Sequence, residues 1–591
     1  MSDATKDSDP GLDAMIERLL ATLRPALAEG GPAFAELTAA MLTSLRKSPV
    51  QLELILQDFY QGQIALWQRW LLPSQPAQDG LTASPDLDTG VPPFFGFLQD
   101  QHLVWERWTE KFAATLDARD DRQRRLRFLI RQWSAAAAPG NFLATNAEAL
   151  HAAVASRGSS LAQGLARLQA DADLGRVTMS SVSDFTVGRD LGATAGAVVL
   201  ENAVMQLIHY RPRAARVASR PLVMVPPFIN KFYVLDLRPG RSLVEWALDQ
   251  GWQVFMISWR NAGETMATAT WDDFVRDGVL AAIDAALEIT RGDGANVLGY
   301  CVGGTLAACA AGVDAAGPGK RISSLTLLAT LLDYADPGDI GVYIDERSVR
   351  EVEARFGAGG IVPAADVANA FASLRPRELI WEVVANNYLL GRQPVASELL
   401  YWNDDGTDVP GPLYAWYLRH LYLMNRLCRP RGVDVCGVPI ALSTIRVPTY
   451  VFAARDDHIV PWASAFESMA LLGGAHRFVL GENGHIGGVV NPPARNRHGY
   501  WTAEVGSANA ADWLASAQHN RGSWWQDWSI WLKTHAGRMK AASARTGSRR
   551  HPPIEEAPGR YVLERAAVVR KATAGPGAAA ATTRNQEGEA E

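Results

Sequence analysis

Residues 295–311 read ANVLGYCVGGTLAACAA, and this stretch decides the fold. Its first residues suit a short buried strand, and its last residues have the alanine-rich composition of a good helix former. Between them the pentapeptide GYCVG, residues 299–303, places a glycine two positions before and two positions after Cys301. A side chain held at a sharp turn between strand and helix needs such small neighbours, because backbone segments pack closely around it. The stretch therefore predicts a strand, a tight turn and a helix, with Cys301 at the turn.

Cys301 is the predicted covalent nucleophile. The helix N-terminus places positive charge beneath its sulfur, and a nearby imidazole can take its proton, so the reactive thiolate is favoured. The alternative is a small buried thiol, which is the preferred interpretation for Cys309, Cys428 and Cys436 because they lack such a turn. The four cysteines include no CxxC pair, so neither a disulfide framework nor a metal site is expected, and a reducing cytoplasm fits.

The acid of a catalytic triad is predicted to be Asp457. On folds with a nucleophile turn of this kind, nucleophile, acid and histidine follow in that order along the chain, each after a strand. The strand-like run 450–453 leads directly into Asp457. Asp456 is the local rival, and a charged loop residue with no catalytic role is the remaining alternative.

The base is predicted to be His485, which lies in a glycine-flanked loop after the strand-like run 477–480. It would take the proton of Cys301 through one ring nitrogen while Asp457 holds the other, which fixes the tautomer. His458 has two open interpretations. It is either a second proton-transfer or substrate-positioning group, or an ordinary loop histidine.

An oxyanion hole needs two preorganised N–H groups. The residue after the nucleophile, Val302, would supply one of them, and an early strand-to-helix loop normally supplies the other. The loop at residues 226–231 follows the strand-like run 222–225, so Ile229 or Asn230 is expected to provide the second donor. A purely structural turn is the alternative.

Strand-like and helical segments alternate after residue 221, which predicts an α/β-hydrolase fold with a mainly parallel sheet flanked by helices. The first part of the chain, residues 1–210, is predicted to be a helical N-terminal domain with a linker near 72–93. The catalytic domain is expected at 211–540 with an inserted cap at about 332–445, because that stretch is too long for one crossover. Residues 541–591 are expected to be a largely disordered tail, although residues 558–562 could still dock on the domain. The strand-like runs are 222–225, 254–257, 295–298, 324–328, 450–453 and 477–480.

Composition excludes several functional classes. The formal net charge is −6 over 591 residues, and no Lys/Arg stripe appears, so nucleic-acid binding is not expected. The polar, acidic start lacks the features of a secretory signal, and the apolar runs are too short for a transmembrane helix. The 48% hydrophobic content indicates a large buried core.

The chain resembles the polyhydroxyalkanoate synthases, specifically the single-subunit class I that prefers short-chain monomers and includes poly(3-hydroxybutyrate) polymerases. The resemblance rests on the sequences of four motifs and on their order along the chain. They are PPFINKFYVLDL at 226–237, GYCVG at 299–303, DHIVPW at 457–462 and GHIGGVVNPP at 484–493.

The resemblance implies an acyltransferase that polymerises (R)-3-hydroxyacyl-CoA, with 3-hydroxybutyryl-CoA as the expected monomer, and releases CoA. It also implies a cytoplasmic homodimer on the surface of a polyester granule, in contact with the growing chain and with phasin-type granule proteins. No cofactor and no metal are expected, because acyl-CoA is itself the substrate.

The substrate-binding candidates are His458, Asp236, Arg375 and Trp402. Arg375 and the nearby Arg377 could meet the CoA phosphates, since guanidinium pairs well with phosphate, although solvated surface arginines are the alternative. Aromatic residues of the predicted cap suit a dry cleft, and an ordinary capped core explains them equally well. They are Trp402, Tyr414, Trp416 and Tyr417.

Two other functions remain alternatives. A Cys-His-Asp hydrolase of the dienelactone hydrolase or thioesterase type would share the fold and triad. The chain length and the sequence of residues 484–493 argue against it. A granule-associated protein without activity would share the fold alone, and the intact triad argues against that.

Overall fold

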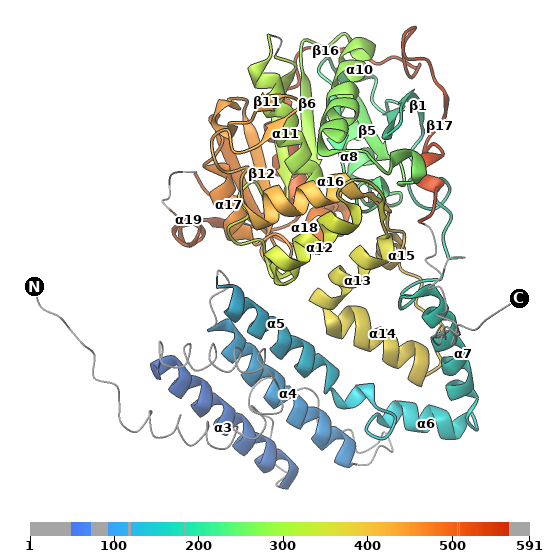
Figure 1. Ribbon diagram of the computed structural model, residues 1–591, viewed down its shortest axis with the longest axis vertical. Coiled ribbons are helices and arrows are strands. Elements are labelled where there is room, and N and C mark those ends of the chain that lie inside the picture. Colours follow the sequence, from blue (N-terminus) through green and yellow to red (C-terminus); the bar gives the residue numbers. More distant parts are fainter. Residues whose placement is uncertain are drawn as a thin grey trace, which may run out of the picture.

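The computed structural model describes residues 49–71, 93–115, 120–181, 184–318, 320–504, 506 and 509–566. The expectations for residues 1–48, for most of the predicted linker and for the end of the predicted tail at 567–591 lie outside the described residues. Figure 1 shows the main chain in two parts, an upper part built around a sheet and a lower part built from helices.

The central sheet joins eleven strands within the described ranges, in the order β15-β14-β13-β12-β7-β6-β4-β5-β2-β1-β17. The six strands from β13 to β5 in that order are parallel, and the strands at both edges are antiparallel. The parallel strands are β4 (Leu222–Val225), β5 (Val254–Trp259), β6 (Ala295–Tyr300), β7 (Ile322–Leu328), β12 (Thr449–Ala454) and β13 (His476–Gly481). The edge strands are β1 (Gly196–Glu201), β2 (Met205–Tyr210), β14 (Tyr500–Thr502), β15 (Gln518–Asn520) and β17 (Glu555–Glu556).

The parallel strands are buried on both faces, as their continuous apolar runs predict. Every residue of β4, β5, β6 and β12 is buried. Strands covered by helices on both sides read as unbroken apolar runs, because neither face meets water. Each of the six predicted strand-like runs lies within one of these strands, and the predicted α/β-hydrolase fold is confirmed.

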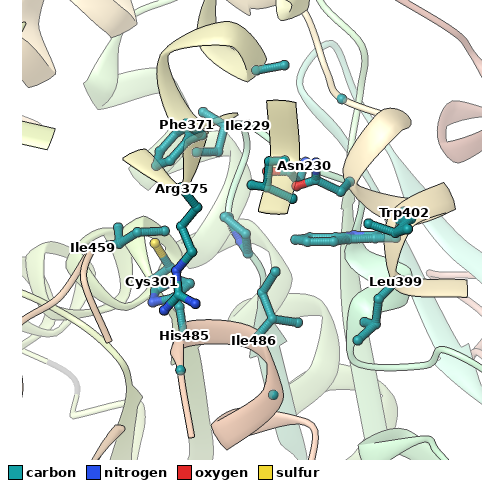
Figure 2. A pocket seen from close by; sticks show the side chains of 18 of the residues that line it. Ile229, Asn230, Cys301, Phe371, Arg375, Leu399, Trp402, Ile459, His485 and Ile486 are labelled. Atoms are coloured by element: carbon teal, nitrogen blue, oxygen red, sulfur yellow. The ribbon is translucent and has the colours of Figure 1, made fainter. Parts of the chain in front are cut away.

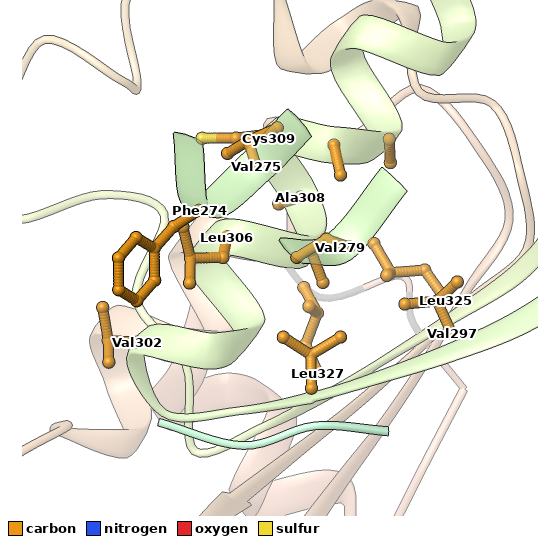
Figure 3. Packing of buried hydrophobic residues seen from close by; sticks show 14 of the residues in the cluster. Phe274, Val275, Val279, Val297, Val302, Leu306, Ala308, Cys309, Leu325 and Leu327 are labelled. Atoms are coloured by element: carbon orange, nitrogen blue, oxygen red, sulfur yellow. The ribbon is translucent and has the colours of Figure 1, made fainter. Parts of the chain in front are cut away.

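Helices cover the two faces of the sheet and form two buried clusters. One cluster contains α10 (Ala281–Thr290) and α11 (Val302–Ala316), and Figure 3 shows side chains of α11 packed between the strands and the π-helical turn η5 (Phe274–Leu280). The other contains α8 (Leu243–Asp249) and α20 (Trp524–Lys533). The tryptophans of α20 pack on the sheet, and Trp528 donates its indole N–H to Thr326 Oγ1 at 3.1 Å.

Residues from the end of β7 to η9 (Tyr417–Leu423) form a helical layer across the carboxyl ends of the parallel strands (Figure 1). This layer makes up most of the segment 332–445 that was expected to be a cap, and it is called the cap below. The rest of that segment returns along α11 to the start of β12, with Ile440 against Gly312. The helices of the cap are η6 (Asp339–Tyr343), α12 (Glu346–Phe356), α13 (Ala364–Leu374), η7 (Arg377–Trp381), α14 (Glu382–Val384), η8 (Ala385–Leu389), α15 (Glu398–Asp404), α16 (Gly411–Trp416) and η9 (Tyr417–Leu423). Its short strands are β8 (Ile361–Val362) and β9 (Val409–Pro410), and the hairpin of β10 (Asp434–Val435) and β11 (Val438–Pro439) follows it.

The N-terminal helices pack against the cap. Arg131 on α5 pairs with Asp339 of the cap at 2.6 Å, and Glu106 on α4 pairs with Arg377 at 3.0 Å. On α7, Gly164 lies so close to the cap that an added Cβ would sit 1.9 Å from the carbonyl oxygen of Tyr388. These helices are α3 (Pro49–Leu71), α4 (Pro93–Ala114), α5 (Asp121–Ala136), α6 (Ala147–Ala155) and α7 (Ser159–Leu174).

Two expectations about the ends of the catalytic domain are wrong. Residues 196–210 do not continue the N-terminal helices but form β1 and β2 at the edge of the sheet, since periodicity alone cannot distinguish a short apolar strand from a buried helix. Residues 541–566 are not a disordered tail. They include part of β16 (Met539–Ala541), which pairs with β3 (Arg216–Ala218), and β17, and they bury Tyr561 and Val562.

Candidate active site

Cys301 occupies the sharp turn between β6 and α11 with φ 54° and ψ −129°. A positive φ is unfavourable for a residue with a side chain, so the surrounding packing must hold this conformation. The two flanking glycines make that packing possible. A Cβ on Gly303 would lie 2.3 Å from the carbonyl oxygen of Val225, and a Cβ on Gly299 would lie 2.3 Å from Gly304 Cα.

Asp457 and His485 are brought together by the loops after two neighbouring strands, β12 and β13. His485 begins α18 (His485–Val489), and its Nδ1 atom lies 2.6 Å from Asp457 Oδ2. The other carboxylate oxygen of Asp457 accepts hydrogen bonds from the backbone N–H groups of Ile459 and Val460, each at 2.9 Å. With Nδ1 occupied by the carboxylate, the Nε2 atom of His485 is left to face Cys301.

The electrostatic surroundings favour the protonated form of His485. Burial lowers the pKa of His485, but the charges of Asp457 and Cys301 and the hydrogen bonds to both outweigh burial and raise it to about 10. The ring also stacks on Tyr300, with centroids 5.3 Å apart. An imidazolium beside a sulfur stabilises negative charge on that sulfur, so the arrangement suits a thiolate nucleophile.

A cavity of about 320 Å³ opens at Cys301 and His485 (Figure 2). Its wall includes Ile229 and Asn230, the two predicted sources of the second oxyanion donor. The side chain of Val302 is packed in the core with 2% exposure, and only its backbone, at the first turn of α11, is placed to serve the site. Most of the remaining wall is apolar and includes Phe371, Leu399, Leu400, Ile459 and Ile486.

Arg375 links the cap to the loop that carries Asp457. It lies just after α13, donates through Nε to His458 Nδ1 at 3.3 Å and through Nη2 to the carbonyl oxygen of Asp456 at 3.3 Å. Burial, and then the charge of Arg375, lower the pKa of His458 to about 4, so His458 is neutral at neutral pH. Both residues line the cavity, and Figure 2 shows Arg375 at the same end as Cys301.

Asp236 is a correction to the predicted substrate-binding set. It is 1% exposed and accepts hydrogen bonds from Thr194 Oγ1 at 2.5 Å and Ser242 Oγ at 2.7 Å. The cavity wall, as far as the chain is described, does not include it. The carboxylate instead joins the segment before β1 to the start of α8, because Ser242 is the N-cap of that helix.

The predicted aromatic residues divide between the cavity and the core. Trp402 lines the cavity and donates its indole N–H to the carbonyl oxygen of Lys231 at 2.7 Å. Trp416 and Tyr417 stack on Trp271, with centroids 4.8 and 5.7 Å apart, so for them the interpretation as capped core holds. Arg377 is exposed and paired with Glu106 of α4.

Asp457 and its neighbour Asp456 have different surroundings. Asp456 is exposed and lies 3.4 Å from Arg455, whereas the Asp457 side chain is fully buried against His485. Apart from Arg375, which follows α13, sequence reasoning missed the contribution of that helix, although its signal is visible in the helical spacing of the residues that it adds to the wall. They are Ala364, Val367, Ala368 and Phe371.

The described ranges contain neither a candidate membrane-spanning helix nor a candidate metal site. No helix there is long and apolar enough to cross a membrane. No group of three or more His, Cys, Asp or Glu side chains in the same ranges could hold a metal ion.

Comparison with known proteins gives two family matches and several related chains. Residues 87–247 match the model described as the N-terminus of poly-beta-hydroxybutyrate polymerase (PhaC), and residues 237–492 match the alpha/beta hydrolase fold. The poly(3-hydroxyalkanoate) polymerase subunit PhaC of Cupriavidus necator is 44% identical over 534 residues, covering 89% of this chain and 90% of the relative. The protein of the same name from Rhizobium meliloti is 39% identical, covering 80% and 78%. The poly(3-hydroxyalkanoate) polymerase of Methylorubrum extorquens is also 39% identical, covering 81% and 80%.

Proposed function

The chain belongs to the poly(3-hydroxyalkanoate) polymerase family, and we propose that it polymerises (R)-3-hydroxyacyl-CoA through an acyl chain bound to Cys301. Its expected monomer is 3-hydroxybutyryl-CoA. The observation that carries the proposal is the hydrogen bond between His485 and Asp457. It lies beside the cavity that Cys301 and His485 both line. The catalytic roles of these three residues are part of the proposal.

The first step transfers the acyl group from CoA to the enzyme. The Cys301 sulfur attacks the thioester carbonyl, a new carbon–sulfur bond forms, and the bond to CoA breaks. The proton taken up by His485 passes to the leaving CoA thiolate. One thioester replaces another, so the step is close to isoenergetic and the acyl group stays reactive. The backbone N–H of Val302, with one from Ile229 or Asn230, would bind the negative oxygen of the intermediate.

The second step builds the ester bond. The 3-hydroxyl group of the next monomer loses its proton to His485 and attacks the acyl carbon, while the bond to the Cys301 sulfur breaks. We assign the proton transfer to His485 and not to Asp457, because the Asp457 side chain is fully buried and cannot touch a substrate. Asp457 instead orients the imidazole and stabilises its positive charge.

The apolar wall of the cavity supports polymerisation over hydrolysis. Water that reached the acyl-enzyme would compete with the monomer hydroxyl, so a chain-building enzyme must exclude it. Phe371, Leu399 and Ile486 in the wall disfavour water. We also propose that the enzyme works as a cytoplasmic homodimer at the polyester surface, in contact with phasin-type proteins, as expected for a synthase of this class.

The purified full-length protein, given 3-hydroxybutyryl-CoA, tests the proposal. Free thiol and precipitated product are measured together, and the expected result is CoA release accompanied by an insoluble polyester. Soluble 3-hydroxybutyrate as the only product would identify a thioesterase or related hydrolase instead. No CoA release would favour a granule-associated protein without activity.

A further inference from the structure

Lys231 is a buried lysine at the end of the loop that follows β4. This loop, residues 226–231, is called the β4 loop below, and it also carries Ile229 and Asn230 in the cavity wall. The Lys231 side chain is 4% exposed, so water does not solvate its charge. A buried ammonium group is tolerated only when its N–H groups find acceptors within the protein.

The ammonium group of Lys231 has three acceptors, one for each of its protons. The carbonyl oxygen of Val562 lies 2.6 Å from Nζ, and the carbonyl oxygen of Glu564 accepts a second bond. Asp405, which follows α15 in the cap, supplies a carboxylate oxygen at 3.3 Å. Because an ammonium group has three donors and no acceptor, this site satisfies it fully.

The backbone of the same residue is also held. The carbonyl oxygen of Lys231 accepts the indole N–H of Trp402 at 2.7 Å. Next along the loop, the carbonyl oxygen of Ile229 accepts the backbone N–H of Thr407 at 3.2 Å, and Asn230 forms a β-bridge with Gly406. The β4 loop is therefore joined to the cap by its backbone and by the ion pair of Lys231 with Asp405, and to the C-terminal segment by the same lysine side chain.

The C-terminal segment is itself anchored on the sheet. Glu556 of β17 pairs with Ala197 of β1. Tyr561 is 4% exposed, its hydroxyl donates to the carbonyl oxygen of Asn202 at 2.9 Å, and its N–H donates to Gln206 Oε1 at 3.2 Å. The carbonyl groups that bind Lys231 thus come from a fixed part of the fold.

We propose that Lys231 is a positioning residue that couples the C-terminal segment 555–566 to the β4 loop, so that acyl transfer at Cys301 depends on that segment. The inference rests on the proposed function of Cys301 and of the β4 loop as an oxyanion donor. Such donors act only when they are held in place before the reaction, because displacing one loses its interaction with the developing charge. Lys231 does not touch the substrate in this account.

Lys231→Met tests the coupling, because methionine keeps the length of the side chain and removes the charge and all three donors. Lys540→Met is the matched control, since Lys540 also donates to a backbone carbonyl, that of Thr290 at 2.5 Å, but lies on β16. We expect Lys231→Met to lower kcat for CoA release by about tenfold or more with KM little changed. Lys540→Met should keep the wild-type kcat.

Alkylation of Cys301 by iodoacetamide separates positioning from general damage to the site. Alkylation forms a carbon–sulfur bond without building an oxyanion, so it needs the thiolate but not the β4 loop. In Lys231→Met, we expect Cys301 to be alkylated at the wild-type rate while the rate of acyl transfer falls. Parallel losses of both rates would show that the substitution harms the whole site and would overturn the positioning role.

Amide hydrogen exchange tests the coupling without any substrate. Lys231→Met should speed exchange at residues 228–231. The control variant, Lys540→Met, should exchange at the wild-type rate there. A chain ending after Tyr561 lacks both carbonyl acceptors and should show the same pattern, whereas a chain ending after Ala566 should not. Combining the shorter chain with Lys231→Met should lower kcat little beyond Lys231→Met alone, since the substitution already removes both bonds to the C-terminal carbonyls.

The two proposals fail in different ways. If the wild-type protein releases no CoA, the proposed function fails whatever the variants do, and hydrogen exchange still decides the coupling. If the wild type is active and Lys231→Met retains its kcat and its exchange rates, the coupling is refuted while the proposed function stands.

Discussion

The Nδ1 atom of His485 lies 2.6 Å from the Oδ2 atom of Asp457, although the two residues stand on separate loops. The contact follows from the sheet. β12 and β13 are parallel neighbours paired from Thr449 and His476 onward, so the loops after them leave the same edge side by side. An acid after one strand and a histidine after the next are thereby placed in hydrogen-bond reach.

Asp457→Asn should lower kcat by about 10³-fold or more, because the amide cannot hold the imidazolium or enforce its tautomer. Asp456→Asn is the matched control, since Asp456 is the adjacent exposed carboxylate on the same loop. It should remain close to wild type in CoA release. Equal losses from the two variants would mean that the acid is misassigned.

The pH dependence of stability should report His485. Its pKa rises from 6.5 to about 10 on folding, so its stabilising contribution is fully present below pH 6.5 and is lost as pH rises toward 10. The difference in thermal unfolding midpoint between wild type and His485→Gln should therefore shrink between pH 6.5 and 10. A difference that grows with pH would contradict the assigned direction.

Arg375→Met should raise the pKa of His458. Burial is the larger cause and would still hold the pKa of His458 below 6.5. The positive charge of Arg375, which lowers that pKa further, would be gone. An NMR titration of histidine-labelled protein measures the change directly. Arg377→Met serves as the control because Arg377 pairs with Glu106 instead, and a shift of equal size there would refute the contact between Arg375 and His458.

Gly303→Ala should destabilise the protein and remove activity together. The added Cβ would lie 2.3 Å from the carbonyl oxygen of Val225, a contact that forces backbone movement and costs about 1–3 kcal/mol or more. Gly140→Ala meets nothing within 4 Å and should leave both properties unchanged. Chemical denaturation and CoA release measure the two effects, and a stable, active Gly303→Ala enzyme would contradict the packing account.

The parts of the protein that the sequence predicts well are those specified locally. Cys301, Asp457 and His485 each follow an apolar strand within a few residues, and the turn around Cys301 carries its own glycines. Such signals need no knowledge of distant partners, so the parallel sheet and the three residues could be placed from the printed chain.

The parts that were missed depend on partners far away in the chain. Nothing in the sequence around Lys231 indicates that it is buried, because its acceptor, the carbonyl oxygen of Val562, lies 331 residues later in the chain. The structural role of Asp236 likewise depends on Thr194, 42 residues earlier, and no local pattern around Asp236 indicates that partner. The segment 541–566 has the composition of a tail, and only pairing with an edge strand and burial of Tyr561 order it.

Mass spectrometry of the protein quenched during turnover of 3-hydroxybutyryl-CoA tests the central claim most directly. The peptide that contains both Cys301 and Cys309 should be fragmented, because the two cysteines are eight residues apart and only fragmentation shows which of them carries the adduct. Burial raises the pKa of Cys309 to about 12, which leaves it unreactive. The account predicts a ladder of adducts on Cys301, each longer by one hydroxyacyl unit. An unmodified Cys301 during active turnover, or the same ladder on another residue, would contradict it.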